Sequence, residues 1–309
     1  MKIKTRRYYI YYILKIGGFF IAVFPLRIGL FMATVVGRLI FIFGKKERRT
    51  AIDNLRNSFP EKSETEIRDI AISVFINLCK NGVEWVNMHY KLNAGNIDRW
   101  VTVEGRDIVD RALSRGNGVL MLASHFGNWE LIPVYFLLKG YYGGVIARRI
   151  YFKGYDNFIS GLRTSKGAIV VYRDESPKKI LKILKNNGIV GILADQDVDS
   201  VDGVFVDFFG RKAYTPKAPV ALAMASGAAL IPCFMIREKN GHRLIVEKPI
   251  EIVEKTDKED TIKLNTQAWS QIIERYIRKY PEQWVWIHRR WKTAPHETLP
   301  EKAESTVHK

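Results

Sequence analysis

Apolar residues dominate a long stretch near the start of the chain, from residue 8 to residue 43. Three basic residues interrupt the stretch: Lys15, Arg27 and Arg38. Pro25 should end or kink a helix, because proline cannot donate the helical hydrogen bond. The charge-free pieces, 16–26 and 28–37, are each shorter than the roughly 20 residues of a membrane span. The pattern predicts a hydrophobic helix followed by an amphipathic one, dipping into a membrane or lying along it.

A signal peptide and a soluble hairpin both fit this stretch less well than a membrane anchor. A cleavable signal peptide is disfavoured, because the stretch is too long and no small-x-small cleavage site follows it. A buried hairpin of a soluble protein is the second alternative. Basic residues on both sides favour an anionic cytoplasmic membrane surface: Lys2, Lys4, Arg6 and Arg7 before it, and Lys45, Lys46, Arg48 and Arg49 after it. We therefore expect residues 1–47 to attach the chain to a membrane.

The next segment, up to about residue 98, has the periodicity of amphipathic helices. One apolar face consists of Ala51, Ile52, Leu55 and Phe59. Pro60 should end this helix. Ser63 and Glu66 have the spacing of a capping box and should begin a second helix. Its apolar face would contain Ile67, Ile70, Val74 and Leu78.

From residue 101 the pattern changes to short apolar runs that alternate with helical periodicity. The predicted strands are 119–123, 144–147, 168–171, 190–194 and 229–234. Continuous apolar strands separated by helices indicate a sheet that is buried on both faces. We expect an α/β fold with a mixed, mostly parallel central sheet flanked by helices, over residues 48–294. The polar tail, 295–309, should fray.

Charge adds a constraint on binding partners. The chain of 309 residues has 49 Lys and Arg against 32 Asp and Glu, a net charge of +17, and a pI near 9.7. Such a surplus attracts anions, whether nucleic acid, anionic lipid headgroups or an acidic carrier protein. Cys79 and Cys233 each lie in an apolar run, which favours buried thiols in a reducing compartment. No zinc-binding spacing occurs.

The segment 124–130, Ser-His-Phe-Gly-Asn-Trp-Glu, is the most informative for chemistry. It follows the predicted strand 119–123, and we expect a helix to begin at about Asn128. Such a position, at the end of a strand, is where α/β folds open into a ligand crevice. His125 and Glu130 would diverge by about 140° on one regular helix. They can meet if His125 lies on the preceding turn, which Gly127 favours. Glu130 could then orient the imidazole as a general base. The alternative is a surface histidine and a glutamate that favours a helix N-terminus.

Two further groups of residues admit two interpretations each. Asp195 and Asp197 end an apolar strand, so they either shape a site or cap the next turn. Together with Asp199 and Asp202 they lack the calcium-loop pattern, and we expect no metal or cofactor. An aromatic and basic segment near the end of the chain could stack on nucleic-acid bases. We favour a segment that packs into the core and whose arginines lie at a membrane interface. The segment contains Trp284, Trp286, His288, Arg289, Arg290 and Trp291.

The motif His-Phe-Gly-Asn-Trp-Glu at 125–130 resembles the catalytic motif of the lysophospholipid acyltransferase superfamily, and its aromatic residues resemble the lipid A lauroyl/myristoyl branch. Other blocks resemble that family in the same order. They are Asn54-Leu55 to Phe59-Pro60; Arg149 and Arg163 to Gly167; Asp195 to Asp197; 206–210 with Ala213, Thr215 and Pro216; Pro232 with Arg237; and 281–292. The ordered set spans nearly the whole chain and is more specific than any single block.

The resemblance implies an O-acyltransferase. The donor would be an acyl thioester of acyl carrier protein, and the acceptor a hydroxyl of an anionic, phosphorylated lipid A precursor. His125 would take the hydroxyl proton, and Glu130 would orient His125. Arg149 and Arg163 would bind acceptor phosphates, with Arg148 as a competitor for Arg149. The remaining expected substrate-binding residues are Asp195, Asp197, Gly210 and Thr215. The enzyme would lie at the inner membrane, with its site facing the cytoplasm and no nucleic-acid partner.

Three alternatives remain open. A related acyltransferase could act on a phosphatidylinositol mannoside or a lysophospholipid. A non-catalytic basic protein could bind membrane or nucleic acid and would not need His125. A hydrolase could use the same residues on thioesters. The acyl chain length does not follow from the sequence, because it depends on the depth of an apolar pocket.

Overall fold

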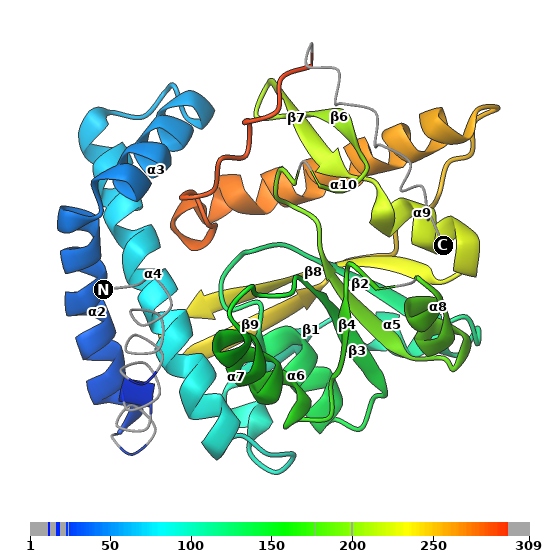
Figure 1. Ribbon diagram of the computed structural model, residues 1–309, viewed down its shortest axis with the longest axis horizontal. Coiled ribbons are helices and arrows are strands. Elements are labelled where there is room, and N and C mark those ends of the chain that lie inside the picture. Colours follow the sequence, from blue (N-terminus) through cyan, green and yellow to red (C-terminus); the bar gives the residue numbers. More distant parts are fainter. Residues whose placement is uncertain are drawn as a thin grey trace, which may run out of the picture.

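A computed structural model describes residues 12, 17, 18, 23, 25–175, 177–198 and 200–295. Residues 296–309 of the polar tail, Asp199, Lys15 and the four basic residues before residue 8 lie outside the described residues. A sheet with helices on both faces forms the centre, and three helices pack together beside it (Figure 1). These three are α2 (Leu26–Phe43), α3 (Lys45–Ser58) and α4 (Glu64–Lys91). The division at residue 47 stays a prediction.

Seven strands form the central sheet in the order β1-β9-β8-β2-β5-β3-β4. Their bounds are β1 Val101–Glu104, β2 Val119–Ala123, β3 Gly143–Ala147, β4 Ile169–Tyr172, β5 Ile189–Leu193, β8 Ala229–Glu238 and β9 Gly241–Val246. All neighbouring pairs are parallel except β8 with β9. The antiparallel hairpin of β6 (Gly203–Phe208) and β7 (Arg211–Pro216) is separate. The predicted mixed, mostly parallel sheet is confirmed.

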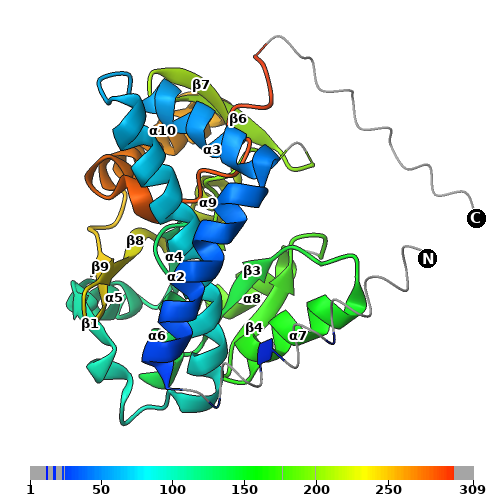
Figure 2. The same cartoon turned by 90° about the vertical axis from the view of Figure 1, so that its left-hand side faces the viewer.

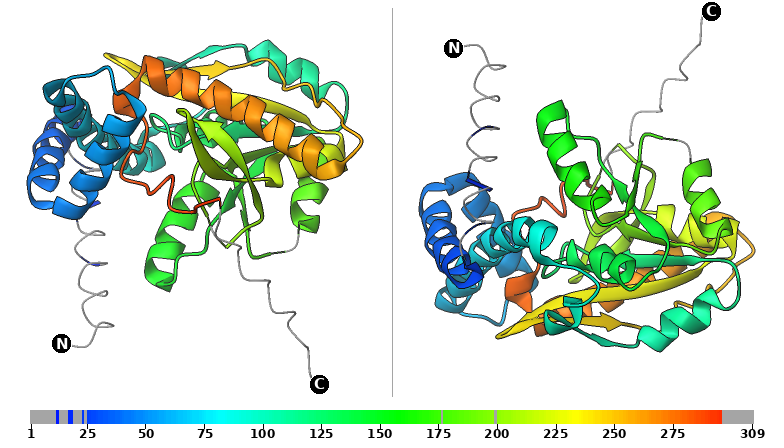
Figure 3. Two further views of the ribbon diagram at one scale, coloured as in Figure 1. Left: turned by 90° about the horizontal axis from the view of Figure 1, so that it is seen from above. Right: turned by 90° about the horizontal axis from the view of Figure 1, so that it is seen from below.

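Helices cover both faces of the sheet, as the continuous apolar strands predicted (Figure 3). In β2, Leu120 and Leu122 join one buried cluster, and Val119, Met121 and Ala123 join the other. The first cluster includes α8 (Lys178–Lys185), α9 (Ala218–Ser226) and α10 (Lys258–Lys279). The second includes α5 (Arg106–Leu113) and α6 (Leu131–Leu138), while α7 (Lys153–Thr164) contacts β4 and α4. Short 3₁₀ turns occupy Ile97–Arg99 and Pro281–Gln283.

Most of the predicted local signals are confirmed. Helix α3 ends at Ser58, two residues before Pro60, and Ser63 exchanges hydrogen bonds with Glu66 in the expected capping box. Both cysteines are free thiols, but only Cys233 is buried as expected, since Cys79 is partly exposed. Helix α6 begins at Leu131 rather than near residue 128. The difference arises because 124–130 is irregular: Gly127 has φ +54° and forms an isolated bridge with Met235 of β8.

Helix α2 begins directly after Pro25 and continues past Arg27 and Arg38, so it contains the second charge-free piece, 28–37, whereas much of the first piece lies outside the described residues. It is the one helix among the described residues that is long and apolar enough to cross a membrane. Gly29, Ala33 and Gly37 form its buried side against α4, and a Cβ on Gly37 would lie 2.6 Å from the Ile76 Cα. Its other side exposes large apolar groups: Ile28, Phe31, Met32, Val35, Val36, Leu39, Ile40, Ile42 and Phe43.

Helix α4 packs along α2 (Figure 2) and reaches the loop that carries His125 through side-chain hydrogen bonds. Asn77, Asn81 and Glu84 recur at helical spacing and therefore share one face. Asn77 donates to the Glu282 carbonyl at 2.9 Å, and Asn81 donates to the Gly127 carbonyl at 2.6 Å. Asn128 donates to Glu84 Oε2 at 2.8 Å. The backbone turn at 127–128 is thus held by side chains of α4.

Glu84 is the charged centre of this contact. Its side chain is 5% exposed and accepts hydrogen bonds from Nη1 and Nη2 of Arg237. Its Oε2 also lies 3.1 Å from His242 Nε2. Burial alone would raise the pKa of Glu84, but hydrogen bonds and charge from His242 and Arg237 outweigh it and lower the pKa to about 2. A buried ion pair contributes little net stability, because desolvation of the charges offsets their attraction. Its main effect here is to hold the side chains of α4 and the backbone at 127–128 in one orientation.

We predict that Glu84→Gln lowers the free energy of unfolding by about 3 kcal/mol at pH 7. The lowered pKa means that ionised Glu84 stabilises the fold above about pH 5, and that this contribution is lost as the pH falls toward 2. Denaturant unfolding at pH 7 and at pH 3 should therefore show a smaller difference between the variant and the wild type at pH 3. Exposed Glu64, replaced by Gln, is the control and should have a much smaller effect. An equal loss at both pH values would contradict the prediction.

Candidate active site

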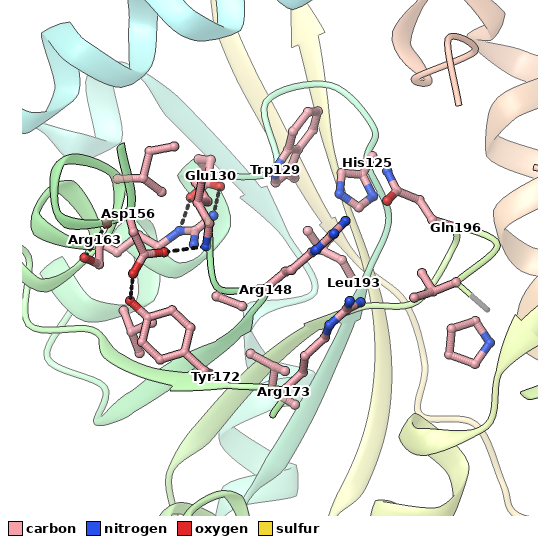
Figure 4. A pocket seen from close by; sticks show the side chains of 18 of the residues that line it. His125, Trp129, Glu130, Arg148, Asp156, Arg163, Tyr172, Arg173, Leu193 and Gln196 are labelled. Carbon is pink, nitrogen blue, oxygen red and sulfur yellow. Dashed lines mark hydrogen bonds and ion pairs between the residues drawn. The ribbon is translucent and has the colours of Figure 1, made fainter. Parts of the chain in front are cut away.

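The carboxyl ends of four neighbouring strands, β2, β5, β3 and β4, surround a cavity of about 510 Å³. Ligands of open α/β sheets bind at such an edge. His125, Glu130, Arg163 and Asp197, all predicted site residues, line this cavity (Figure 4). The structure therefore brings together residues from three separate parts of the sequence.

His125 lies on the turn after β2, as predicted, and its orientation is set by Asp195. The imidazole Nδ1 is 2.7 Å from Asp195 Oδ1, and the His125 backbone N–H donates to Asp195 Oδ2 at 2.9 Å. Trp284 Nε1 donates to the same Oδ2 at 2.8 Å. A carboxylate beside Nδ1 favours the tautomer with the proton on that nitrogen. The other nitrogen, Nε2, is then basic, and the ring lines the cavity.

Asp195 has the charge state that this role needs. Its side chain is 1% exposed, and burial alone would raise its pKa. The charge and hydrogen bond of His125 and the Trp284 N–H have the opposite effect and keep the pKa of Asp195 below its usual value. Nearby Arg290 is also buried, which lowers its pKa to about 10, but it is still a cation at neutral pH. The buried negative charge of Asp195 is therefore compensated.

Glu130 is in the same cavity but has a different partner. Its carboxylate pairs with Arg163 through two hydrogen bonds, Arg163 Nε to Oε2 at 3.0 Å and Arg163 Nη2 to Oε1 at 2.5 Å. The expectation that Glu130 orients His125 is thus revised, because Asp195 occupies that position. The physical reason is that Glu130 is the N-cap residue of α6 and its side chain turns toward α7, while β5 ends directly beside the His125 turn. A catalytic role of Glu130 stays a prediction.

The two neighbouring arginines point in different directions. Arg149 lies outside the cavity lining, where it contacts Asp174 at 3.3 Å and Glu175 at 3.5 Å and stacks 3.9 Å from the Tyr172 ring centre. Arg148, the competing candidate for phosphate binding, lines the cavity. Successive residues of an extended chain point to opposite sides, which explains the separation.

The other predicted site residues have structural contacts. Asp197 accepts from the Thr293 N–H and hydroxyl, each at 2.8 Å. Thr215 is buried in β7 and accepts from Arg290 at 2.5 Å. Gly210 has φ +69° in the β6–β7 turn. Neither Thr215 nor Gly210 is among the residues that line the cavity.

The aromatic and basic segment near residue 290 packs into the core. Trp284 and Trp286 are 1% and 0% exposed, which confirms the packing interpretation. The prediction that its arginines meet a membrane interface is wrong for Arg290, which is 1% exposed and donates to the Tyr214 carbonyl. The segment also pairs with the His125 loop, because Val285 N–H donates to the His125 carbonyl at 3.2 Å.

The sequence did not predict three features of the site. Asp195 orients His125, Trp284 donates to Asp195, and Arg173 lines the cavity. A usable signal existed for two of them. Asp195 and Arg173 each follow an apolar strand, as His125 does. Polar residues after neighbouring parallel strands meet at one edge, but strand order is needed to know which ones are neighbours.

The chain is similar in sequence to known acyltransferases. The sequence profile of the bacterial lipid A biosynthesis acyltransferases matches residues 1–293. The lipid A biosynthesis lauroyltransferase of Escherichia coli K12 is 30% identical over 275 residues, covering 84% of each chain. The palmitoleoyltransferase of lipid A biosynthesis from the same organism is 26% identical, covering 88% of this chain and 87% of its own.

A phosphatidylinositol mannoside acyltransferase of Mycobacterium tuberculosis CDC 1551 is also similar. It is 28% identical over 209 residues, covering 66% of this chain and 63% of its own. The match to the lipid A profile begins at the first residue and ends two residues after Trp291. The chain therefore belongs to the bacterial lipid A biosynthesis acyltransferase family.

Proposed function

We propose that this protein transfers an acyl chain from the thioester of an acyl carrier protein to a hydroxyl of a lipid A precursor, late in lipopolysaccharide biosynthesis. One observation carries the chemistry: an imidazole in a cavity has one nitrogen bonded to a buried carboxylate, which leaves the other nitrogen basic. That arrangement suits removal of a proton from an alcohol.

The proposed reaction proceeds without a covalent acyl-enzyme. His125 Nε2 takes the hydroxyl proton as the acceptor oxygen attacks the thioester carbonyl carbon. The carbon–sulfur bond then breaks, and the thiolate leaves with the proton from the imidazolium. The products are an ester and a thiol, so atoms and charges balance. Ionised Asp195 stabilises the imidazolium throughout.

Glu130 and Arg163 form the adjoining wall in this proposal. Their pairing fixes both side chains, and Arg163 also lies 5.7 Å from the Trp85 ring centre. A narrow apolar crevice continues from this wall between α6 and the sheet. It is lined by Met121, Ile132, Pro133, Val145, Gly191 and Leu193. The thioester's acyl chain would enter here, and α6 would have to shift to admit a long chain.

Membrane attachment is part of the proposal. The exposed apolar side of α2 would enter the bilayer, while Arg27 and Arg38, both exposed, would reach the headgroups. The excess of basic residues suits the inner membrane surface facing the cytoplasm, where both anionic partners would be found. A lipid acceptor could then reach the cavity without leaving the membrane surface completely.

A second acceptor class has specific support. Because the chain is similar to a phosphatidylinositol mannoside acyltransferase, a mannoside of that kind is the alternative acceptor. The same cavity and the same base would serve both acceptors, so only the product distinguishes them.

The first test is a transfer assay with acyl carrier protein thioesters and mass spectrometry of the lipid product. We expect a lipid A precursor to gain one acyl chain, and His125→Ala to reduce the rate at least about 100-fold while the protein stays folded. Asp207→Asn, an exposed change on β6, is the control. Equal release of free fatty acid with and without acceptor would identify a hydrolase instead. Transfer to the mannoside alone would favour the second acceptor.

The second test separates the two carboxylates. Asp195→Asn should lower kcat about 100- to 10,000-fold with little change in KM. The new amide would place its NH₂ group against Nδ1, because the His125 and Trp284 N–H groups still need the oxygen. The proton would then sit on Nε2, which could no longer act as a base. Glu130→Gln should lower kcat less, and steady-state kinetics on variants of checked thermal stability measure both. A larger loss for Glu130→Gln would return the orienting role to Glu130.

A further inference from the structure

Two arginines lie side by side at the edge of the sheet that forms the cavity. Arg148 follows β3 and Arg173 follows β4. These parallel strands pair Ala147 with Tyr172, so the two arginines occupy the next positions of the same register. The Arg173 N–H donates to the Ala147 carbonyl at 2.9 Å, which continues the pairing to this point.

Both guanidinium groups point into the cavity on the side of His125 (Figure 4). They differ in this from Arg149, which is held outside by Asp174 and Glu175. Arg173 also donates to the Ser200 hydroxyl at 3.1 Å, and Ser200 lines the same cavity. The pair is thus placed by the strands and directed toward the proposed base.

The sheet order determines how far the pair lies from the chemistry. His125, Asp195, Arg148 and Arg173 follow β2, β5, β3 and β4, which are consecutive in the sheet. Neighbouring strands are about 4.8 Å apart, so the arginines begin two and three strands from His125, or roughly 10–15 Å. That separation suits a group which belongs to the substrate but does not react.

Charge around the pair favours an anion. Arg163 and Glu130 neutralise each other. The remaining described charges of the cavity lining are Arg148, Arg173 and Lys292 against Asp156 and Asp197. Both oxygens of Asp156 accept from neutral donors, the Ile150 N–H at 2.8 Å and the Tyr172 hydroxyl at 2.7 Å. Thr293 engages both oxygens of Asp197. The described lining is therefore positive on balance, and its two remaining carboxylates are already engaged.

We propose that Arg148 and Arg173 form a subsite for a phosphate ester of the substrate. Two guanidinium groups side by side match the oxygens of a phosphate, which arginine binds through paired hydrogen bonds. The phosphate could belong to the lipid acceptor or to the phosphodiester of the carrier protein's pantetheine arm, and the chemistry is the same. This assignment rests on the proposed function and moves the expected phosphate contacts from Arg149 and Arg163 to Arg148 and Arg173.

Kinetics with matched substrates identify the source of the phosphate. In Arg148→Gln/Arg173→Gln, KM for the phosphorylated acceptor should rise about 10- to 100-fold while kcat changes little. KM for the dephosphorylated acceptor should not rise. If the donor's phosphate is bound instead, KM for the carrier thioester should rise while KM for an N-acetylcysteamine thioester stays constant. Equal changes with and without phosphate, or no change, would overturn the subsite.

A binding measurement tests the subsite even if the wild type transfers no acyl chain, an outcome that would refute the proposed function alone. Inorganic pyrophosphate should raise the melting temperature of the wild-type protein, and the double variant should lose this shift. Lys185→Gln removes a charge from an exposed position outside the cavity lining and should retain the shift. Arg149→Gln should also retain the shift, because Arg149 lies outside the cavity whereas its neighbour Arg148 lines it. A shift that persists in the double variant, or that only Arg149→Gln abolishes, would contradict the assignment.

Discussion

The contact between the His125 imidazole and the Asp195 carboxylate is the interaction on which the site depends. It joins the ends of two neighbouring strands, and it decides which imidazole nitrogen is basic. The same carboxylate also accepts from Trp284, so the carboxyl-terminal segment helps to hold the base. Because a buried carboxylate is costly without such partners, each of these donors is needed for the geometry of the others.

Buried charges recur around this contact, and each is compensated locally. Arg290 lies near Asp195 and Asp197, Arg163 pairs with Glu130, and Arg237 pairs with Glu84. Apolar packing could stabilise a fold of this size with less desolvation. Ion pairs, by contrast, fix the direction of the groups that they join. These buried ion pairs are therefore better explained by the positioning of the His125 loop than by their contribution to the stability of the fold.

The arrangement also relates the cavity to the apolar helix α2. Glycines of α2 lie against one side of α4, and the polar side chains of α4 hold the backbone after His125. The helix with the exposed apolar side and the loop that carries His125 are thus separated by a single helix. In the proposed function, this arrangement would bring the base close to the membrane surface from which the acceptor comes.

The sequence by itself determined the α/β class, the main apolar strands, the end of α3, the start of α4 and the position of His125 on the turn after a strand. Those features depend on local periodicity, on proline and on capping residues, which act over a few positions. Only the tertiary structure decided which carboxylate faces the imidazole. Glu130 is five residues away and turns toward Arg163, whereas Asp195 is 70 residues away and lies on the adjacent strand. Similarly, only the register of β3 and β4 brings Arg148 beside Arg173, because strand order is set by long-range packing.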